Sequence, residues 1–194
     1  MSMIKYPIFD KKLDNGLHVV FVNYPGQMCS IRTIVKAGSI LEGEFLGSGI
    51  SHYAEHLVAG CTTSKRSEED YKNLTTLLGG AYNAYTTTDH TSYYINTTEN
   101  HLKTAVDILF EWMFFCSFED REVEREKEVI TREIEKNEAS IYRTFFYLAQ
   151  QNFYSHHPLN CHWCLESFEK WAPYLDGPLY GLFDFLSRKI TDST

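Results

Sequence analysis

The sequence predicts an α+β fold: a mostly antiparallel sheet with helices packed on one face. Runs rich in β-branched and aromatic residues occur between turn residues over 17–35 and 81–98, which is typical of strands. Apolar residues recur at steps of three and four over 51–58, 71–78 and 102–113, which is typical of amphipathic helices. With 194 residues, 43% of them hydrophobic, the chain has the material for one core. Strands and helices are therefore expected to be mixed in one α+β unit.

The predicted strands fall into two groups. An Asx-Gly turn at 15–16 precedes alternating apolar residues over 17–21, and a β-branched run over 29–35 indicates a second strand. Later in the chain, two runs rich in Tyr and Thr flank residues 89–90. These two runs are expected to form a hairpin.

The predicted helices lie between and after the strands. Ser51 is the expected N-cap of the first helix, and Ser67, followed by Glu69 and Asp70, is the expected start of the second. The third helix is predicted over 102–113. The fourth runs from about 120 to 137, and the helical pattern continues to His156.

Charge and cysteine content exclude several classes of protein. A net charge of -8 has the wrong sign for a protein that binds phosphate backbones, so no nucleic-acid partner is expected. Charges interrupt every apolar run before it could span a membrane, and the N-terminus lacks the apolar stretch of a leader. Five cysteines, an odd number, fit a reducing compartment, so we expect a cytoplasmic protein in which Cys29 and Cys116 are buried apolar residues.

The pentapeptide H-Y-A-E-H carries the chemistry that is easiest to recognise. Steps of three and four residues place His52, Glu55 and His56 on one face of the first helix. Two imidazoles one turn apart can bind one zinc ion, and a neighbouring carboxylate can accept a proton from a zinc-activated water. The alternative is a chance pentapeptide, and a catalytic zinc site also needs a third protein ligand.

The fourth predicted helix offers that third ligand. Glu126 and Glu133 are seven residues apart and share a stripe with Val129, Ile130 and Asn137. A carboxylate on an apolar face needs a positive partner, and zinc with two histidines would provide one. The alternative is a solvated acidic face, which is the interpretation that we give to the other acids of this region, at 119, 120, 122, 124, 128, 135 and 138.

The two motifs together resemble the inverzincin zinc peptidases, the family of pitrilysin, insulin-degrading enzyme and the mitochondrial processing peptidase. The inverted H-x-x-E-H is followed, 77 residues after His56, by Glu133 in the run E-K-E-V-I-T-R-E-I. Further matches are L-D-N-G-L-H-V-V, N-A-Y-T-T-T-D-H-T-S-Y-Y and H-H-P-L. The resemblance implies one half-domain of a pitrilysin-type clamshell over residues 1–160, followed by a divergent or truncated tail over 161–194.

The resemblance also implies roles for individual residues. Zinc would be the cofactor, with His52, His56 and Glu133 as its ligands. Glu55 would be the general base, and Glu126 would orient a ligand. The residues expected to bind an extended peptide as an added strand are Asn83, Ala84 and Tyr85, for which an ordinary aromatic strand is the alternative.

Two functions follow from this resemblance. The first is a zinc endopeptidase that acts on extended peptides and needs a second homologous half, in the same chain or as a partner subunit, for full activity. The alternative is a non-catalytic, zinc-containing subunit that binds peptides or takes part in assembly. The tail adds one further motif, the C-H-W-C sequence of Cys161 and Cys164, which is compatible with a redox dithiol or a second zinc site.

Overall fold

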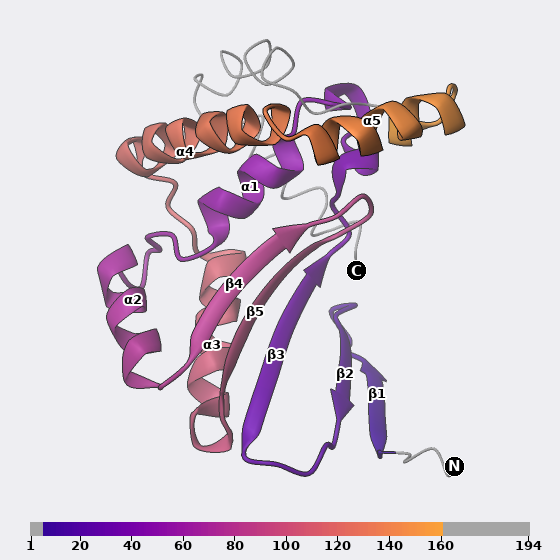
Figure 1. Ribbon diagram of the computed structural model, residues 1–194. Helices are drawn as coiled ribbons and strands as arrows, with labels where there is room; N and C mark the ends of the chain where they lie inside the picture. The colour runs from indigo at the N-terminus through magenta and orange to yellow at the C-terminus, as the bar shows by residue number, and fades with distance from the viewer. Residues whose placement is uncertain (1–5, 161–194) are drawn as a thin grey trace.

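The computed structural model describes residues 6–160 and confirms the α+β class (Figure 1). The predicted tail over 161–194, with Cys161 and Cys164, lies outside the described residues. Over residues 6–160, no helix has both the length and the apolar character needed to cross a membrane.

Strands and helices follow one another in a mixed order. The strands are β1 (Ile8–Lys12), β2 (His18–Val22), β3 (Met28–Val35), β4 (Ala81–Thr86) and β5 (Thr91–Thr98). The α-helices are α1 (Ile50–Val58), α2 (Glu68–Leu77), α3 (Leu102–Phe114), α4 (Asp120–Glu138) and α5 (Ile141–Phe153). Single 3-10 turns lie at Ser39–Leu41, Gly43–Phe45, Glu99–His101 and Pro158–Asn160.

Three strands form an antiparallel sheet in the order β3-β5-β4. The predicted hairpin is confirmed, because β4 pairs with β5 from Ala81 opposite Asn96 to Thr86 opposite Thr91. β4 has a neighbouring strand on one side only, within the described residues. Its other side is therefore an edge that can accept another strand.

A separate two-stranded ribbon, β1 and β2, precedes this sheet (Figure 1). β2 confirms the strand predicted after the Asx-Gly turn, in which Asn15 Oδ1 accepts a hydrogen bond from the Leu17 amide at 3.1 Å. β1 was not predicted, because its sequence I-F-D-K-K groups the apolar residues instead of alternating them.

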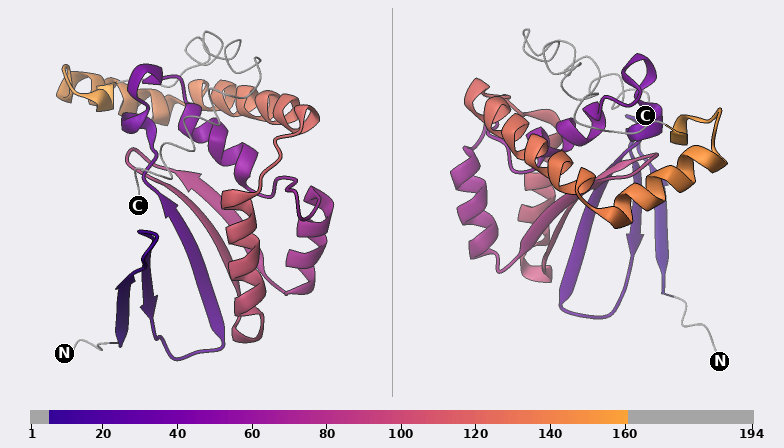
Figure 2. Two further views of the ribbon diagram at one scale, coloured as in Figure 1. Left: turned by 180° about the vertical axis from the view of Figure 1, so that it is seen from behind. Right: turned by 45° about the horizontal axis from the view of Figure 1, so that its top comes forward.

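The helices cover the sheet and its end. Figure 2 shows α3 against one face of the three-stranded sheet, and α1 lies between β4 and α4, with contacts to both. The predicted capping of α2 is confirmed, because Ser67 and Asp70 form a reciprocal capping box. The helical run predicted after residue 120 is divided into α4 and α5, because the backbone of Ser140 is extended and this residue is the N-cap of α5. α5 ends at Phe153, three residues before the predicted end at His156.

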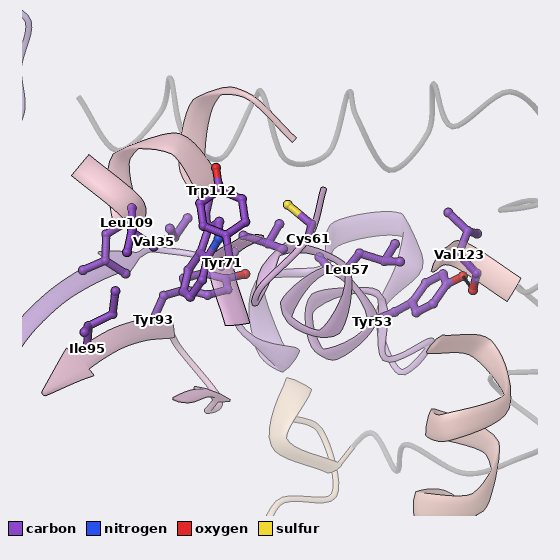
Figure 3. Packing of buried hydrophobic residues seen from close by; sticks show 14 of the residues in the cluster. Val35, Tyr53, Leu57, Cys61, Tyr71, Tyr93, Ile95, Leu109, Trp112 and Val123 are labelled. Carbon is purple, nitrogen blue, oxygen red and sulfur yellow. Dashed lines mark hydrogen bonds between the residues drawn. The ribbon is translucent and has the colours of Figure 1, made fainter. Parts of the chain in front are cut away.

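The core lies between the sheet, α1 and α3 (Figure 3). Trp112 of α3 is 1% exposed, and its ring makes edge contacts with Tyr71 and Tyr82, at centroid distances of 5.8 and 5.2 Å. Tyr53 of α1 is also 1% exposed and donates a hydrogen bond to the Val123 carbonyl in α4 at 3.0 Å. The tyrosine thus fixes α1 to α4 with both apolar and polar contact.

The start of α1 differs from the prediction. The helix begins at Ile50, and Gly49, with φ of 76°, is its N-cap, so the prediction that Ser51 caps the helix is wrong. The buried side chain of Glu42 caps the helix instead. Its two oxygens accept hydrogen bonds from the amides of Gly49 at 3.3 Å and Ser51 at 2.9 Å. A carboxylate at a helix N-terminus satisfies free amides and interacts favourably with the helix dipole.

We expect Glu42→Ala to lower the free energy of unfolding by about 1–3 kcal/mol, because it leaves two buried amides without their acceptor. Chemical denaturation would measure this loss. Glu44→Ala is the matched control, since Glu44 is exposed in the next 3-10 turn. Equal effects of the two substitutions would contradict the capping role of Glu42.

Two further predictions are corrected in the segments that join α1 and α3 to α2 and α4. Cys116 is not an isolated buried residue, because it forms a disulfide with Cys61. Glu122, which we placed on a solvated face, is 4% exposed and accepts hydrogen bonds from the hydroxyl and amide of Thr62. The loop that follows α1 is thus attached to both the end of α3 and the first turn of α4.

Candidate metal centre

Three side chains from two helices meet above β4. His52 and His56 lie one turn apart on α1, and Glu133 lies on α4. The two imidazole Nε2 atoms are 3.2 Å apart. Glu133 Oε2 lies 3.7 Å from Nε2 of His52 and 3.8 Å from Nε2 of His56. The structure therefore brings together the three residues that the sequence proposes as metal ligands.

The geometry of these three atoms fits a zinc ion. A point equidistant from all three lies about 2.1 Å from each, which is the length of Zn–N and Zn–O bonds in protein sites. Two neutral imidazoles and one carboxylate are also a donor set found in catalytic zinc sites. Glu133 is about half exposed, whereas the two histidine side chains are mostly buried.

Glu126 orients one of the two histidines. Its Oε2 lies 3.1 Å from His56 Nδ1, while Arg125 donates hydrogen bonds to its Oε1. With a proton on Nδ1, the imidazole presents the lone pair of Nε2 to the centre of the triangle. Burial raises the pKa of Glu126, but the hydrogen bonds from His56 and Arg125 lower it by more than burial raises it. The pKa is therefore below its ordinary value, and the carboxylate is kept ionised.

The two histidines have different proton affinities. Burial, together with the charges of His56 and Arg143, lowers the pKa of His52 to about 4, which keeps its ring neutral near pH 7. For His56, burial also lowers the pKa, but the hydrogen bond to Glu126 and the charges of Glu133 and Glu55 raise it more strongly. A metal ion at this place would satisfy the same carboxylates that otherwise attract a proton to His56.

Glu55 lies between the two histidines in the sequence and points toward the sheet. It is 8% exposed, and its Oε2 accepts a hydrogen bond from Thr86 Oγ1 at 2.7 Å. Burial is the largest influence and raises the pKa of Glu55 above its ordinary value, although the hydrogen bond from Thr86 and the charge of His56 act to lower it. A carboxylate with a raised pKa beside a cation site has the properties of a general base.

The predicted substrate residues lie on the edge strand β4. Asn83 and Tyr85 are exposed, and Ala84 is partly buried. The Ala84 amide donates a hydrogen bond to the side-chain oxygen of Asn83 at 2.9 Å, and Arg32 donates one to the Tyr85 hydroxyl at 3.1 Å. Because α1 packs on β4, this edge is adjacent to the helix that carries both histidines.

Two residues of this region were not identified from the sequence. Thr86 stands inside the run T-T-T, where nothing distinguishes the threonine that contacts Glu55 from its neighbours. Glu42 lies in a glycine-rich link, and only the fold shows that it reaches the start of α1. The family-like motif N-A-Y-T-T-T marks the run that contains Thr86, but not which threonine contacts Glu55, and no sequence signal marks Glu42.

Comparisons with known proteins place the chain among peptidases and their relatives. Residues 18–164 match the family described as insulinase, peptidase family M16. The chain is 33% identical to cytochrome b-c1 complex subunit 1 of Bos taurus over 67% of this chain and 27% of the relative. It is 34% identical to the mitochondrial-processing peptidase subunit beta of Mus musculus, over 69% of this chain and 27% of the relative.

The fold has a counterpart among solved structures. A protease from Helicobacter pylori superimposes with a TM-score of 0.74 and 22% identity, over 96% of this chain and 50% of that protein. The chain spans about a quarter of the length of the curated relatives it matches.

Proposed function

The chain belongs to the insulinase family of peptidases, family M16, and from this premise we propose that it is the zinc-binding half of a metalloendopeptidase that cleaves extended peptides. One observation carries the proposal: the ligand atoms of His52, His56 and Glu133 surround a point at zinc-binding distance, with the buried carboxylate of Glu55 on the same helix. A purely structural zinc site needs ligands but no general base, so a Glu between the two histidine ligands favours a catalytic site.

Each of these residues has a proposed task. His52, His56 and Glu133 hold the ion, and Glu126 keeps His56 in the tautomer that binds it. Zinc, when bound, polarises a carbonyl and makes a water more acidic. Glu55 accepts a proton from the attacking water and returns it to the leaving amine nitrogen.

The edge strand β4 is the proposed peptide-binding element. A peptide that pairs with Asn83, Ala84 and Tyr85 would lie extended beside α1, with its backbone hydrogen-bonded irrespective of its sequence. This mode of binding suits hydrolysis of a peptide bond, since an extended backbone exposes its carbonyls.

A second homologous half is a proposed partner. The solved protease is about twice as long as the matched region, and two of the relatives are named as subunits of larger proteins. Groups that stabilise the developing oxyanion contribute about 3 kcal/mol each in other hydrolases. If the second half supplies such groups, this chain alone cleaves peptides weakly or not at all.

A non-catalytic subunit is the second candidate function. The observation in its favour is that family relatives include cytochrome b-c1 complex subunit 1 as well as a subunit named for a peptidase. In this case the chain would bind zinc or peptides without hydrolysis. Cleavage that depends on Glu55 separates the two functions.

Zinc titration tests the metal site directly. We expect the wild-type chain to bind one zinc ion at this site, and Glu133→Ala to weaken binding by at least a factor of ten, because it removes one of three ligands. Equilibrium dialysis with elemental analysis measures the affinity. The reference chain and the Glu133→Ala variant both also carry Cys161→Ser and Cys164→Ser, so that this cysteine pair cannot contribute a second zinc site.

Glu135→Ala is the matched control, since Glu135 is an exposed carboxylate on the same helix. Its zinc affinity should equal that of the wild type. The proposed ligand set is wrong if Glu133→Ala also binds zinc like the wild type.

A further inference from the structure

Thr86 is the last residue of β4, and its hydroxyl contacts the side chain of Glu55. The distance from Thr86 Oγ1 to Glu55 Oε2 is 2.7 Å. Two other acceptors are more distant: Thr91 Oγ1 at 3.2 Å and the Ser51 carbonyl at 3.5 Å. The hydroxyl therefore lies where the end of the sheet meets the metal-binding helix.

The direction of this hydrogen bond follows from counting protons. Thr91 is 3% exposed and donates its hydroxyl proton to the Ala37 carbonyl at 2.7 Å, so toward Thr86 it can act only as an acceptor. Thr86 has one hydroxyl proton to give. The carboxylate of Glu55 is both the nearest acceptor and the charged one, and it therefore receives the proton in a charge-assisted hydrogen bond.

From this geometry we propose that Thr86 is a positioning residue for Glu55. By holding Oε2, Thr86 fixes the plane of the carboxylate and leaves Oε1 to accept the proton of the attacking water. The proposal rests on the proposed function, in which Glu55 is the general base. It adds that the orientation of the base is set from the sheet.

The position of Thr86 links this base to the peptide-binding edge. Thr86 directly follows Asn83, Ala84 and Tyr85 in the same strand. A peptide that pairs with these residues aligns itself on the strand that also orients Glu55. The same strand therefore sets the position of the scissile carbonyl and the orientation of the general base. Misplacement of a catalytic group by about 1 Å can cost about a hundredfold in rate.

The test compares Thr86→Val, which keeps the shape but removes the hydroxyl, with Thr86→Ser, which keeps the hydroxyl. Thr88→Val is the control, since Thr88 is an exposed threonine two residues away. The zinc-loaded chain is assayed alone and with a homologous second half, on an internally quenched peptide. We expect Thr86→Val to lower kcat about ten- to hundredfold with little change in KM, and Thr86→Ser to restore most of it.

Two readouts separate positioning from a general structural role. In a Glu55→Gln background, Thr86→Val should have no further effect on kcat, because Thr86 acts through Glu55. In chains labelled with ¹³C at the Glu carboxyl carbons, the Glu55 resonance, assigned by its loss in Glu55→Gln, should move in Thr86→Val and not in Thr88→Val. Unfolding midpoints and zinc affinities of all variants should stay close to the wild type.

An unchanged kcat in Thr86→Val, or an equal loss in the Glu55→Gln background, overturns the positioning role. An unmoved Glu55 resonance overturns it too, whatever the activity of the chain. If the wild-type chain shows no Glu55-dependent cleavage even with a competent second half, the proposed function is overturned instead, and the resonance then still decides whether Thr86 orients the carboxylate.

Discussion

Glu55→Gln is expected to reduce zinc-dependent peptide cleavage about a thousandfold while the chain keeps its zinc. The glutamine side chain has nearly the same size as the glutamate side chain, and its carbonyl oxygen can still accept the hydrogen bond from the Thr86 hydroxyl. The fold and the metal ligands are therefore preserved. It cannot accept a proton from the attacking water. General acid–base groups contribute about 10²- to 10⁴-fold in enzymes, and the middle of that range is the expected loss.

The measurement is single-turnover cleavage of an internally quenched peptide by the chain with its homologous second half, with zinc content determined on the same samples. Glu69→Gln, an exposed glutamate on α2, serves as the control and should cleave like the wild type. Cleavage at an undiminished rate by Glu55→Gln, with zinc bound, would remove Glu55 from the mechanism. Absence of cleavage by the wild type with a competent second half would favour the non-catalytic subunit.

Trp112→Ala is expected to lower the free energy of unfolding by about 3–5 kcal/mol, the usual cost of removing a large buried aromatic side chain. Trp112 is 1% exposed and its ring contacts that of Tyr71 of α2 (Figure 3). It also contacts the ring of Tyr82 of β4. The cavity would therefore separate α3 from both a helix and the peptide-binding strand. For a domain of this size, such a loss is a large fraction of the total stability.

Urea denaturation measures this loss, and Phe110→Ala is the matched control, because Phe110 lies on the same helix and is 52% exposed. The control should change the free energy of unfolding much less than Trp112→Ala does. Similar losses in both variants would mean that the core is not centred on Trp112.

Much of the fold was predictable because its signals are local. The capping box at Ser67 and the Tyr- and Thr-rich hairpin over 81–98 are encoded by neighbouring residues. The relation between His52, Glu55 and His56 is also local, since one helix turn fixes it. The meeting with Glu133 was predicted from the stripe on α4 and from the family resemblance, and the structure brings the atoms together, while zinc binding stays a prediction.

The features that were missed depend on contacts distant in the sequence. Glu42 caps α1 across a glycine-rich link, Cys116 pairs with Cys61 over a separation of 55 residues, and Glu122 turns inward to meet Thr62. In each case the residue type alone favours a different interpretation, an exposed acid or an isolated cysteine. Only the fold, in which α1 packs on α4, makes these partners adjacent.

The hydrogen bond between the Ala84 amide and the Asn83 side chain bears on how the chain behaves in a crowded solution. A sheet edge that can receive a peptide can equally receive the edge of another molecule, which is a common route to aggregation. Here one amide of that edge already has an acceptor within its own strand. A visiting strand must displace the Asn83 carboxamide before it can bond to the Ala84 amide, so brief and poorly matched encounters are disfavoured. A well-registered peptide compensates with its other backbone contacts.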